Sequence, residues 1–118
     1  LDYVAAVNAR AKMGLHMNRF HEDWDLLLTP ALAVPAFDTG RIAPPGFEGR
    51  EWLRWTPFTY PFNLTGQPAA SVPCGFTSDG LPVGLQIVGR WRDEATVLRA
   101  AACFEAAQPW AAIRPSIG

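Results

Sequence analysis

The side chains that could act as nucleophiles in this chain are few and scattered. Hydrolysis through a covalent intermediate needs an activated nucleophile, a base within reach and hydrogen-bond donors for the oxyanion. The serines are Ser71, Ser78 and Ser116, and none lies in a Gly-x-Ser-x-Gly turn or between two glycines. Lys12 is the single lysine, and it falls in a stretch with a helical pattern. We therefore expect none of the 118 residues to be catalytic.

The thiols and imidazoles offer no better site. Cys74 and Cys103 lack the spacing of a metal site, and we expect both to be reduced, buried, small hydrophobic residues. A nucleophilic Cys74 would need a histidine base, and neither histidine is arranged for that role. His16 and His21 are five residues apart, whereas a metal-binding pair on a helix needs a spacing of three or four. We therefore expect no metal ion and two histidines at the surface or at the rim of a site.

The composition argues against several functional classes. With 118 residues, of which 49% are hydrophobic, the chain is predicted to form a single domain with a core. The formal net charge of −1 provides no basic field for nucleic acid, and no apolar run approaches the roughly 20 residues of a membrane-spanning helix. The chain starts at Leu1 without a Met or a basic leader, so we expect it to be cut from a longer protein. We expect a cytoplasmic location, because both cysteines are expected to be reduced.

The hydrophobic pattern predicts an α/β fold. Apolar residues recur at helical spacing near both ends of the chain, and shorter apolar runs closed by Gly or Pro lie between them. Ser78-Asp79-Gly80 is a turn signal that makes the last two runs neighbouring strands. The helices are expected near 2–21 and 94–107, and the strands near 25–29, 70–74 and 83–88. We expect these strands to belong to one mixed sheet that both helices cover.

Local signals add detail to several of these elements. The first helix carries two apolar stripes, which predict packing on more than one side. Leu26-Leu27-Leu28 is a continuous apolar run, which predicts a strand buried on both faces. Asp93 is a suitable N-cap for the last helix. Asn63 to Pro68 reads as the end of a short helix or a turn, because Gly66 can adopt a positive φ.

The stretch from Thr56 to Arg90 carries a family resemblance. The segments FNLTGQPAASVPCGF and GLPVGLQIVGR, followed by a charged helix that ends in FEAAQPW, resemble the C-terminal segment of amidase-signature enzymes. These enzymes are serine hydrolases that cleave carboxamide bonds, and they include the A subunit of glutamyl-tRNA(Gln) amidotransferase. The resemblance is dense from about Trp24 to Pro109 and weaker at both ends.

The resemblance implies that residues 1–118 are the C-terminal segment of one amidase-signature domain with a mixed-sheet α/β/α fold. No position matches the family's Ser-Ser-Lys triad or its Gly/Ser-rich oxyanion segment, so the catalytic part would lie upstream and the segment alone would be inactive. The implied partners are that N-terminal part and a small-molecule amide, without cofactor, metal, nucleic acid or membrane. An isolated segment would expose strand edges and apolar surface, which favours a homo-oligomer.

Two places are expected to border the substrate pocket. Thr29 and Pro30 end the first strand, and ligands in mixed sheets usually lie beyond the C-terminal ends of parallel strands. The long connection 31–55 is typical either of a binding loop or of a surface excursion. Trp52 and Trp55 would line an apolar pocket in the first case and anchor the loop in the second.

Thr56 bears on the kind of amide. Amidotransferase A subunits carry an acidic residue a few places before their N-x-x-G-x-P motif, where it holds the substrate ammonium. The matching position, seven residues before Asn63, is Thr56. Because an unpaired ammonium in a pocket is costly, the resemblance favours a general amidase for an aryl or aliphatic amide over a glutamine-dependent amidotransferase. A standalone, non-catalytic binding or assembly module is the remaining alternative.

Overall fold

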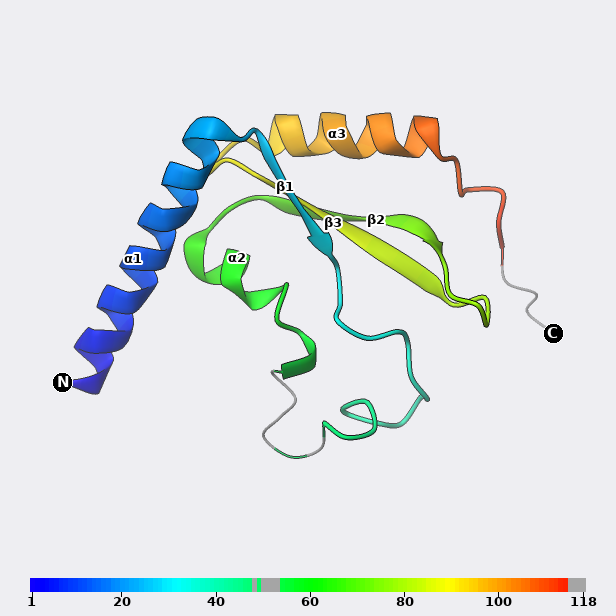
Figure 1. The fold of residues 1–118 in the computed structure, drawn as a ribbon, viewed down its shortest axis with the longest axis horizontal. Coiled ribbons are helices and arrows are strands. Elements are labelled where there is room, and N and C mark those ends of the chain that lie inside the picture. The colour runs from blue at the N-terminus through cyan, green and yellow to red at the C-terminus, as the bar shows by residue number, and fades with distance from the viewer. Residues whose placement is uncertain (48, 50–53, 115–118) are drawn as a thin grey trace.

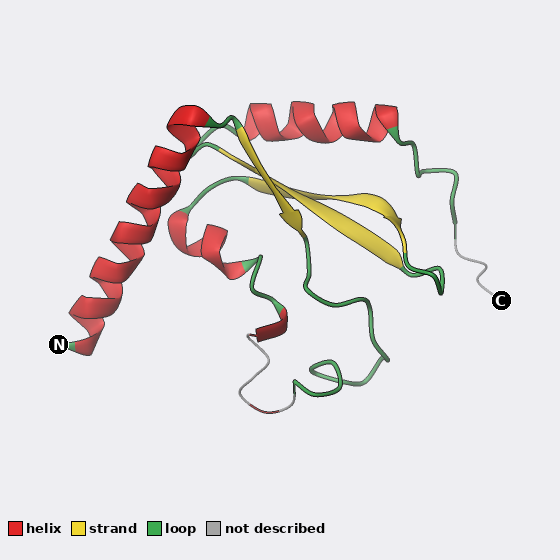
Figure 2. Cartoon of the chain, in the orientation of Figure 1, coloured by secondary structure: helices red, strands yellow, loops and turns green. Residues whose placement is uncertain are grey.

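The described part of the chain consists of three α-helices and a three-stranded sheet (Figures 1 and 2). The computed structural model describes residues 1–47, 49 and 54–114. The helices are α1 (Asp2–Asp23), α2 (Tyr60–Thr65) and α3 (Glu94–Ala107), and the strands are β1 (Leu26–Pro30), β2 (Ala69–Phe76) and β3 (Pro82–Gly89). These elements spread over 54 × 38 Å and are only 18 Å deep, so few positions are interior.

The three strands form one sheet in the order β1-β3-β2, and both pairings are antiparallel. The α/β class, the two long helices and the three strands are therefore confirmed close to their expected bounds. The short helix α2 also ends as the sequence predicts, because Gly66 is its left-handed C-cap with a φ of 82°. The parallel pairings that a mixed sheet requires do not occur among these three strands.

The hairpin between β2 and β3 forms at the predicted turn. The Thr77 backbone N–H donates to the Leu81 carbonyl oxygen at 2.8 Å, and the Leu81 N–H donates to Thr77 Oγ1 at 3.0 Å. Gly80 adopts a φ of 82°, which favours glycine. A β-bulge between Pro73 and Gly75 shifts the register along β2, where Pro73 has no N–H to donate.

Helix α3 packs against β2 and β3 (Figure 1). The Asp93 carboxylate accepts a hydrogen bond from the Thr96 backbone N–H at 3.2 Å, so the predicted N-cap is confirmed. Hydrogen bonds from Thr96 hold the pKa of Asp93 below its ordinary value. Val97 is 3% exposed and packs against Gly89, where a Cβ would lie 2.5 Å from Val97 Cγ2. The glycine therefore permits the close approach of helix and strand.

Helix α1 projects away from the sheet, and its main partner is α2 (Figure 1). Arg10 Nε donates to the Leu64 carbonyl oxygen at 2.6 Å, which satisfies one of the last carbonyls of α2. Val4, Val7 and Leu15 are 58%, 47% and 61% exposed. The expectation that α1 covers the sheet and packs on more than one side is therefore wrong within this chain, because the described residues leave these side chains uncovered.

The corner between α1 and β1 buries His21, which the sequence placed at the surface. The His21 side chain is buried, and its Nδ1 lies 2.9 Å from the Trp24 carbonyl oxygen. Arg90 holds the same corner, since its Nε donates to the His21 carbonyl oxygen at 2.9 Å and a terminal nitrogen pairs with Asp25 at 2.9 Å. The expectation of a surface or rim position is wrong for His21, which lies at a corner where Arg90, 69 positions away, binds the last turn of the helix.

Strand β1 is an edge of the described sheet and is not buried on both faces. Leu28 pairs with Ile87 in register, so the two side chains share one face of the sheet. Leu28 is nevertheless 57% exposed, whereas Ile87 is fully buried, because α3 packs on β2 and β3. Both cysteines are free thiols, but Cys103 is exposed on α3 rather than buried as expected.

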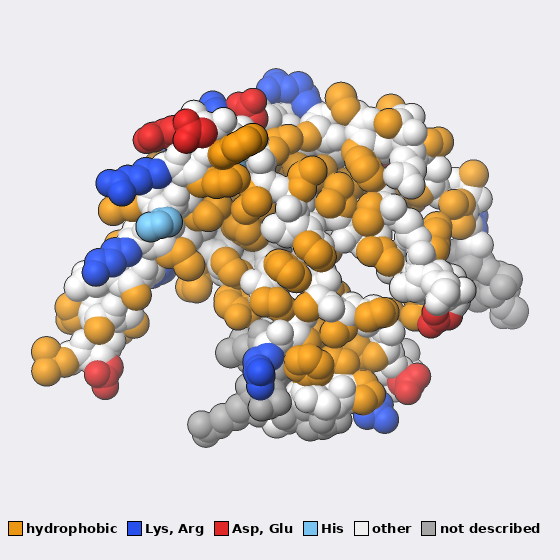
Figure 3. All heavy atoms as spheres, in the orientation of Figure 1, with side chains coloured by type: hydrophobic (Ala, Val, Ile, Leu, Met, Phe, Trp, Pro, Cys, Tyr) orange, Lys and Arg blue, Asp and Glu red, His pale blue; other side chains and the backbone are white. Residues whose placement is uncertain are grey.

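The core of this flat arrangement is small. Its buried hydrophobic residues are Ala43, Phe62, Ile87, Val88 and Val97. Hydrophobic side chains also cover much of the face seen in Figure 3, including the surface over the sheet. The described helices include none that is both long and apolar enough to cross a membrane.

Candidate functional site

The end of β1 borders two shallow grooves that are mostly apolar. One groove, of about 320 Å³, includes Thr29 and Pro30. The other, of about 310 Å³, lies between residues 31–36 and the start of β3. Both are lined by Val83 and Gly84, so they adjoin at β3. The described residues that line the first groove are Leu28, Thr29, Pro30, Cys74, Val83, Gly84 and Leu85.

This geometry places two predicted residues beside a groove, although not for the expected reason. The expectation used the C-terminal ends of parallel strands, whereas β1 pairs with β3 in the antiparallel direction. Gly84 permits the close approach of neighbouring side chains at this point, because a Cβ on it would lie only 2.9 Å from both Ala31 Cβ and Ser71 Oγ. The Ala31 N–H donates to the Gly84 carbonyl oxygen at 2.9 Å, which fixes the chain as it leaves β1. A role for Thr29 and Pro30 in substrate binding stays a prediction.

A buried glutamine connects the end of β1 to a distant loop. Gln86, on β3, is 7% exposed, and its Nε2 donates to Thr29 Oγ1 at 2.9 Å and to the Phe58 carbonyl oxygen at 2.7 Å. Thr29 Oγ1 in turn donates to the Pro30 carbonyl oxygen at 3.0 Å. Sequence reasoning missed Gln86, and the available signal was a lone amide in the middle of an apolar strand.

The same loop contains Trp55 and Thr56. The Trp55 ring packs edge-on against Phe37, with ring centroids 5.3 Å apart and planes at 88°, so the aromatic pair joins the two ends of the long connection. Trp55 Nε1 is buried and has no hydrogen-bond partner in the described part of the chain. Thr56 is half-buried, and its carbonyl oxygen accepts a hydrogen bond from the Thr59 N–H at 3.3 Å. Trp52 lies outside the described residues.

Three of the five predicted pocket residues, Thr29, Pro30 and Thr56, are therefore linked through the hydrogen bonds of Gln86. Thr29 is bound directly by Gln86, and Pro30 accepts from Thr29. Thr56 belongs to the turn whose Phe58 carbonyl is bound by the same amide. Trp55 precedes that turn and contacts the other end of the loop through Phe37.

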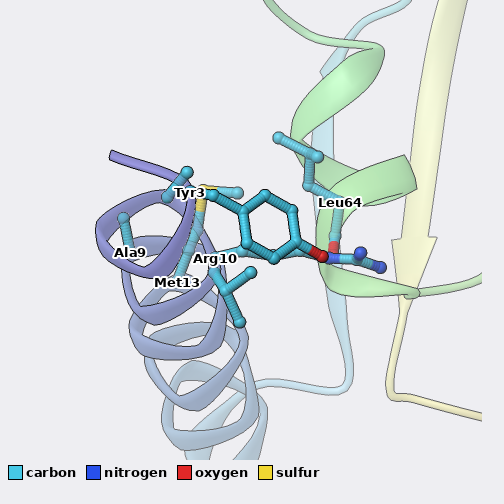
Figure 4. Close-up of a pocket in the computed structure, with 7 residues that line it drawn as sticks. Tyr3, Ala9, Arg10, Met13 and Leu64 are labelled. Carbon is cyan, nitrogen blue, oxygen red and sulfur yellow. The ribbon is translucent and has the colours of Figure 1, made fainter. Parts of the chain in front are cut away.

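A further groove lies between α1 and α2, where no sequence signal predicted one (Figure 4). It encloses about 550 Å³. Tyr3, Arg10 and Met13 of α1 face Leu64 of α2 across it. The described residues that line it are Tyr3, Ala6, Val7, Ala9, Arg10, Met13 and Leu64. The apolar lining merges with the uncovered face of α1.

In the described part of the chain, the potentially reactive groups are not assembled into a site. Lys12 is exposed on α1, and Ser71 is exposed on β2. Ser78 lies in the hairpin turn and donates to the carboxylate of Asp79 at 2.9 Å. Cys74 Sγ lies 3.5 Å from the Val83 carbonyl oxygen, as a weak donor. Across residues 1–47, 49 and 54–114, no three His, Cys, Asp or Glu side chains are grouped so that they could hold a metal ion.

Apolar grooves with a few fixed polar groups are typical of sites that orient small organic molecules. The described residues of this chain provide such a surface, with Thr29 as a polar residue of its lining and the buried Gln86 behind it as the partner of Thr29. They bring no nucleophile and base together there. The arrangement can bind and orient a ligand, and the chemistry requires groups from elsewhere.

Comparisons with known proteins agree with this picture. The acylamidase of Rhodococcus erythropolis is 50% identical over 100 residues, which are 82% of this chain and 21% of the acylamidase. The A subunit of glutamyl-tRNA(Gln) amidotransferase from Oceanobacillus iheyensis is 36% identical over 118 residues, which are 98% of this chain and 23% of that protein. A bacterial aryl acylamidase described as an amidase-signature enzyme superimposes with a TM-score of 0.77 at 36% identity, over 95% of this chain and 25% of that enzyme.

The chain thus spans between a fifth and a quarter of the length of these relatives. The family model described as Amidase matches residues 1–98, which is most of the chain. The resemblance to amidase-signature enzymes that rested on residues 56–90 is confirmed by these matches. This chain belongs to the Amidase family.

Proposed function

We propose that the chain is the C-terminal part of a serine amidase that hydrolyses carboxamide C–N bonds. In this proposal it completes the enzyme's sheet and forms one wall of the substrate pocket. The observation that carries the proposal is the match of residues 1–98 to the Amidase family together with the short coverage of these relatives. A cytoplasmic location belongs to the same proposal, and it draws support from two cysteines that are both free thiols.

The nucleophilic serine, the bridging serine and the lysine would then lie in a preceding part of the polypeptide. Ser71 and Lys12 are exposed on separate elements, which supports the placement of the catalytic residues outside this chain. The preceding part would also be the main partner of the chain. It would cover the apolar side chains of α1 and the groove between α1 and α2. Without it, we expect the chain to self-associate through these surfaces.

The substrate class that we favour is an aryl or aliphatic amide. The acylamidase of Rhodococcus erythropolis supports this choice by its 50% identity. Thr56 supports it as well, because a neutral threonine cannot pair with the ammonium of glutamine. Thr56 and Trp55 would then face the non-reacting part of the amide, together with Thr29, Pro30 and Trp52.

The A subunit of a glutamine-dependent amidotransferase is the second candidate. It is favoured by the Oceanobacillus iheyensis protein, which aligns with 98% of this chain. The two candidates differ in the reaction that they require: a general amidase releases ammonia or an amine from many amides, whereas the amidotransferase uses glutamine. A standalone binding module is a third candidate, and it predicts no hydrolysis of any amide.

The test compares the 118-residue chain with the longer polypeptide encoded by the same gene. Both are purified and assayed with an anilide, an aliphatic amide and glutamine. We expect the longer polypeptide to hydrolyse the anilide or the aliphatic amide more efficiently than glutamine, and the 118-residue chain to be inactive. Ser78→Ala, in the exposed hairpin turn, is the matched control and should leave the activity of the longer polypeptide unchanged.

Three outcomes would overturn parts of the proposal. Hydrolysis by the 118-residue chain that Ser71→Ala or Cys74→Ala abolishes would place a catalytic residue in this segment. Efficient hydrolysis of glutamine alone would favour the amidotransferase. A gene whose product has no further sequence before Leu1, with no amide hydrolysis, would favour the binding module.

A further inference from the structure

We propose that Gln86 is a positioning residue that holds the pocket wall in its binding conformation. This inference rests on the proposed amidase function and adds a specific residue to it. The Gln86 side chain would not touch the reacting atoms. It would act through Thr29 and through the turn that follows Trp55, and so determine how the substrate is oriented.

The position of Gln86 in the sheet makes this possible. Gln86 lies directly opposite Thr29 on β1 and opposite Ser71 on β2, so the three side chains share one face of the sheet. Gly89 is three residues further along β3 and faces α3, which places Gln86 on the face away from that helix. A buried amide on that face is directed toward the loop.

Both N–H groups of the Gln86 amide are used, and each binds a different segment. One donates to Thr29 Oγ1 at 2.9 Å and the other to the Phe58 carbonyl oxygen at 2.7 Å. These partners are 57 and 28 positions away in the sequence. A single amide therefore ties the end of β1 and the loop before α2 to the central strand.

The two hydrogen bonds extend to the predicted pocket residues. Because Thr29 Oγ1 accepts from Gln86, its hydroxyl hydrogen is directed to the Pro30 carbonyl oxygen at 3.0 Å. Phe58 lies within the turn closed by the Thr59 N–H and the Thr56 carbonyl oxygen at 3.3 Å. Fixing the Phe58 carbonyl therefore also restrains Thr56, at the position that distinguishes the two candidate functions.

The chemistry of an amide is specific here. Glutamine is neutral and offers two donors, as the two oxygen acceptors require. A carboxylate at this position would place a negative charge against the Phe58 carbonyl oxygen, and a methionine would fill the same space without a donor. A buried acceptor that loses its donor costs the desolvation of that group.

The first test is a local one that does not depend on catalysis. Hydrogen exchange at the Thr59 amide is compared between the unmodified protein and Gln86→Met. We expect the variant to exchange about tenfold faster, because the loss of one hydrogen bond is worth up to about a factor of ten in the local opening equilibrium. Gln67→Met is the matched control: Gln67 is equally buried, its Nε2 has no hydrogen-bond partner in the described part of the chain, and its Oε1 accepts from Thr65 Oγ1, at the opposite end of α2 from Thr59.

The second test uses the kinetics of anilide hydrolysis by the longer polypeptide. Gln86→Met should raise KM about tenfold and change kcat by less than about threefold, because the wall binds the substrate but does not act on the reacting bond. Gln86→Glu should resemble Gln86→Met at neutral pH. It should regain part of the lost affinity at low pH, where a protonated Glu side chain can donate one hydrogen bond. Gln67→Met should change neither KM nor this pH profile.

The outcomes separate the two proposals. Faster exchange at Thr59 and a raised KM in Gln86→Met, with Gln67→Met unaffected, support the positioning role. Unchanged exchange in Gln86→Met, or an equal change in Gln67→Met, overturns it. If Gln86→Met does not fold, Gln86→Glu decides through the protection factor of the Thr59 amide, which corrects for the intrinsic pH dependence of exchange, and a protection factor that does not change with pH overturns the role. If no amide is hydrolysed, the proposed function fails, while the exchange comparison still decides the role of Gln86.

Discussion

Helices α1 and α3 carry similar apolar patterns but lie in different surroundings. In α3, Val97 is 3% exposed against the sheet, whereas in α1 Val7 is 47% exposed. Periodicity shows which face of a helix is apolar, but it does not show whether the covering surface belongs to the same stretch of chain. The difference indicates that α3 buries part of its apolar face against the sheet, through Val97, whereas the valines at the start of α1 stay uncovered by the described residues.

The most decisive way to test this comparison is to remove the same methyl groups from both helices. Val97→Ala should lower the free energy of unfolding by about 2 kcal/mol, because it removes buried methyl groups and leaves a cavity. Val7→Ala, the matched change on α1, should alter it by no more than about 0.5 kcal/mol, because the side chain is half exposed and Ala favours a helix. Urea denaturation of the chain measures both. An equal loss in the two variants would show that α1 is packed in this chain.

Two glycine substitutions compare an uncovered position in α1 with a constrained position at the end of α2. Gly66→Ala should destabilise the chain by about 1–2 kcal/mol, because the residue has a φ of 82° and a Cβ would lie 3.3 Å from Trp91 Nε1. Gly14→Ala should stabilise it by up to about 1 kcal/mol, because the position is helical and a Cβ there meets nothing within 4 Å. Thermal unfolding followed by circular dichroism measures both. A stabilising Gly66→Ala would contradict the left-handed helix end.

The smallest expected effect is a pH dependence at the start of α3. Hydrogen bonds from Thr96 lower the pKa of Asp93 in the folded state, so the contribution of Asp93 is present above its ordinary pKa and is lost as the pH falls through the folded value. Asp93→Asn keeps a good N-cap without an ionisable group. Unfolding at about pH 6 and about pH 3 should therefore show a larger acid loss for the unmodified chain than for the variant. Equal losses would exclude a contribution from Asp93.

The fold could largely be predicted from the sequence because its elements depend on local signals. Asp93 begins α3, Gly66 ends α2, and Gly80 makes the hairpin turn, each through a preference of the residue itself. The errors came from long-range contacts. His21 is buried at a corner where Arg90, 69 positions away, binds its carbonyl oxygen, and Leu28 is exposed because α3 packs on β2 and β3.

The site was less accessible to sequence reasoning. Strand ends, loop length and family resemblance predict the pocket residues Thr29, Pro30, Trp52, Trp55 and Thr56. The structure connects Thr29, Pro30 and the turn that contains Thr56 through Gln86, which none of these signals indicates. Gln86 has two partners that are far away in the sequence, so no local spacing reveals its role. The groove between α1 and α2 is also formed by segments that are distant in the chain.

We propose that the apolar side chains of α1 left exposed beside α2 are covered by a preceding part of a longer polypeptide. Hydrogen exchange across α1 and α3 tests it most directly, measured for the 118-residue chain and for the longer polypeptide. We expect the amides of α1 to be strongly protected only in the longer polypeptide, and the amides of α3 to be protected in both. Equal protection of α1 in the two proteins would contradict the claim.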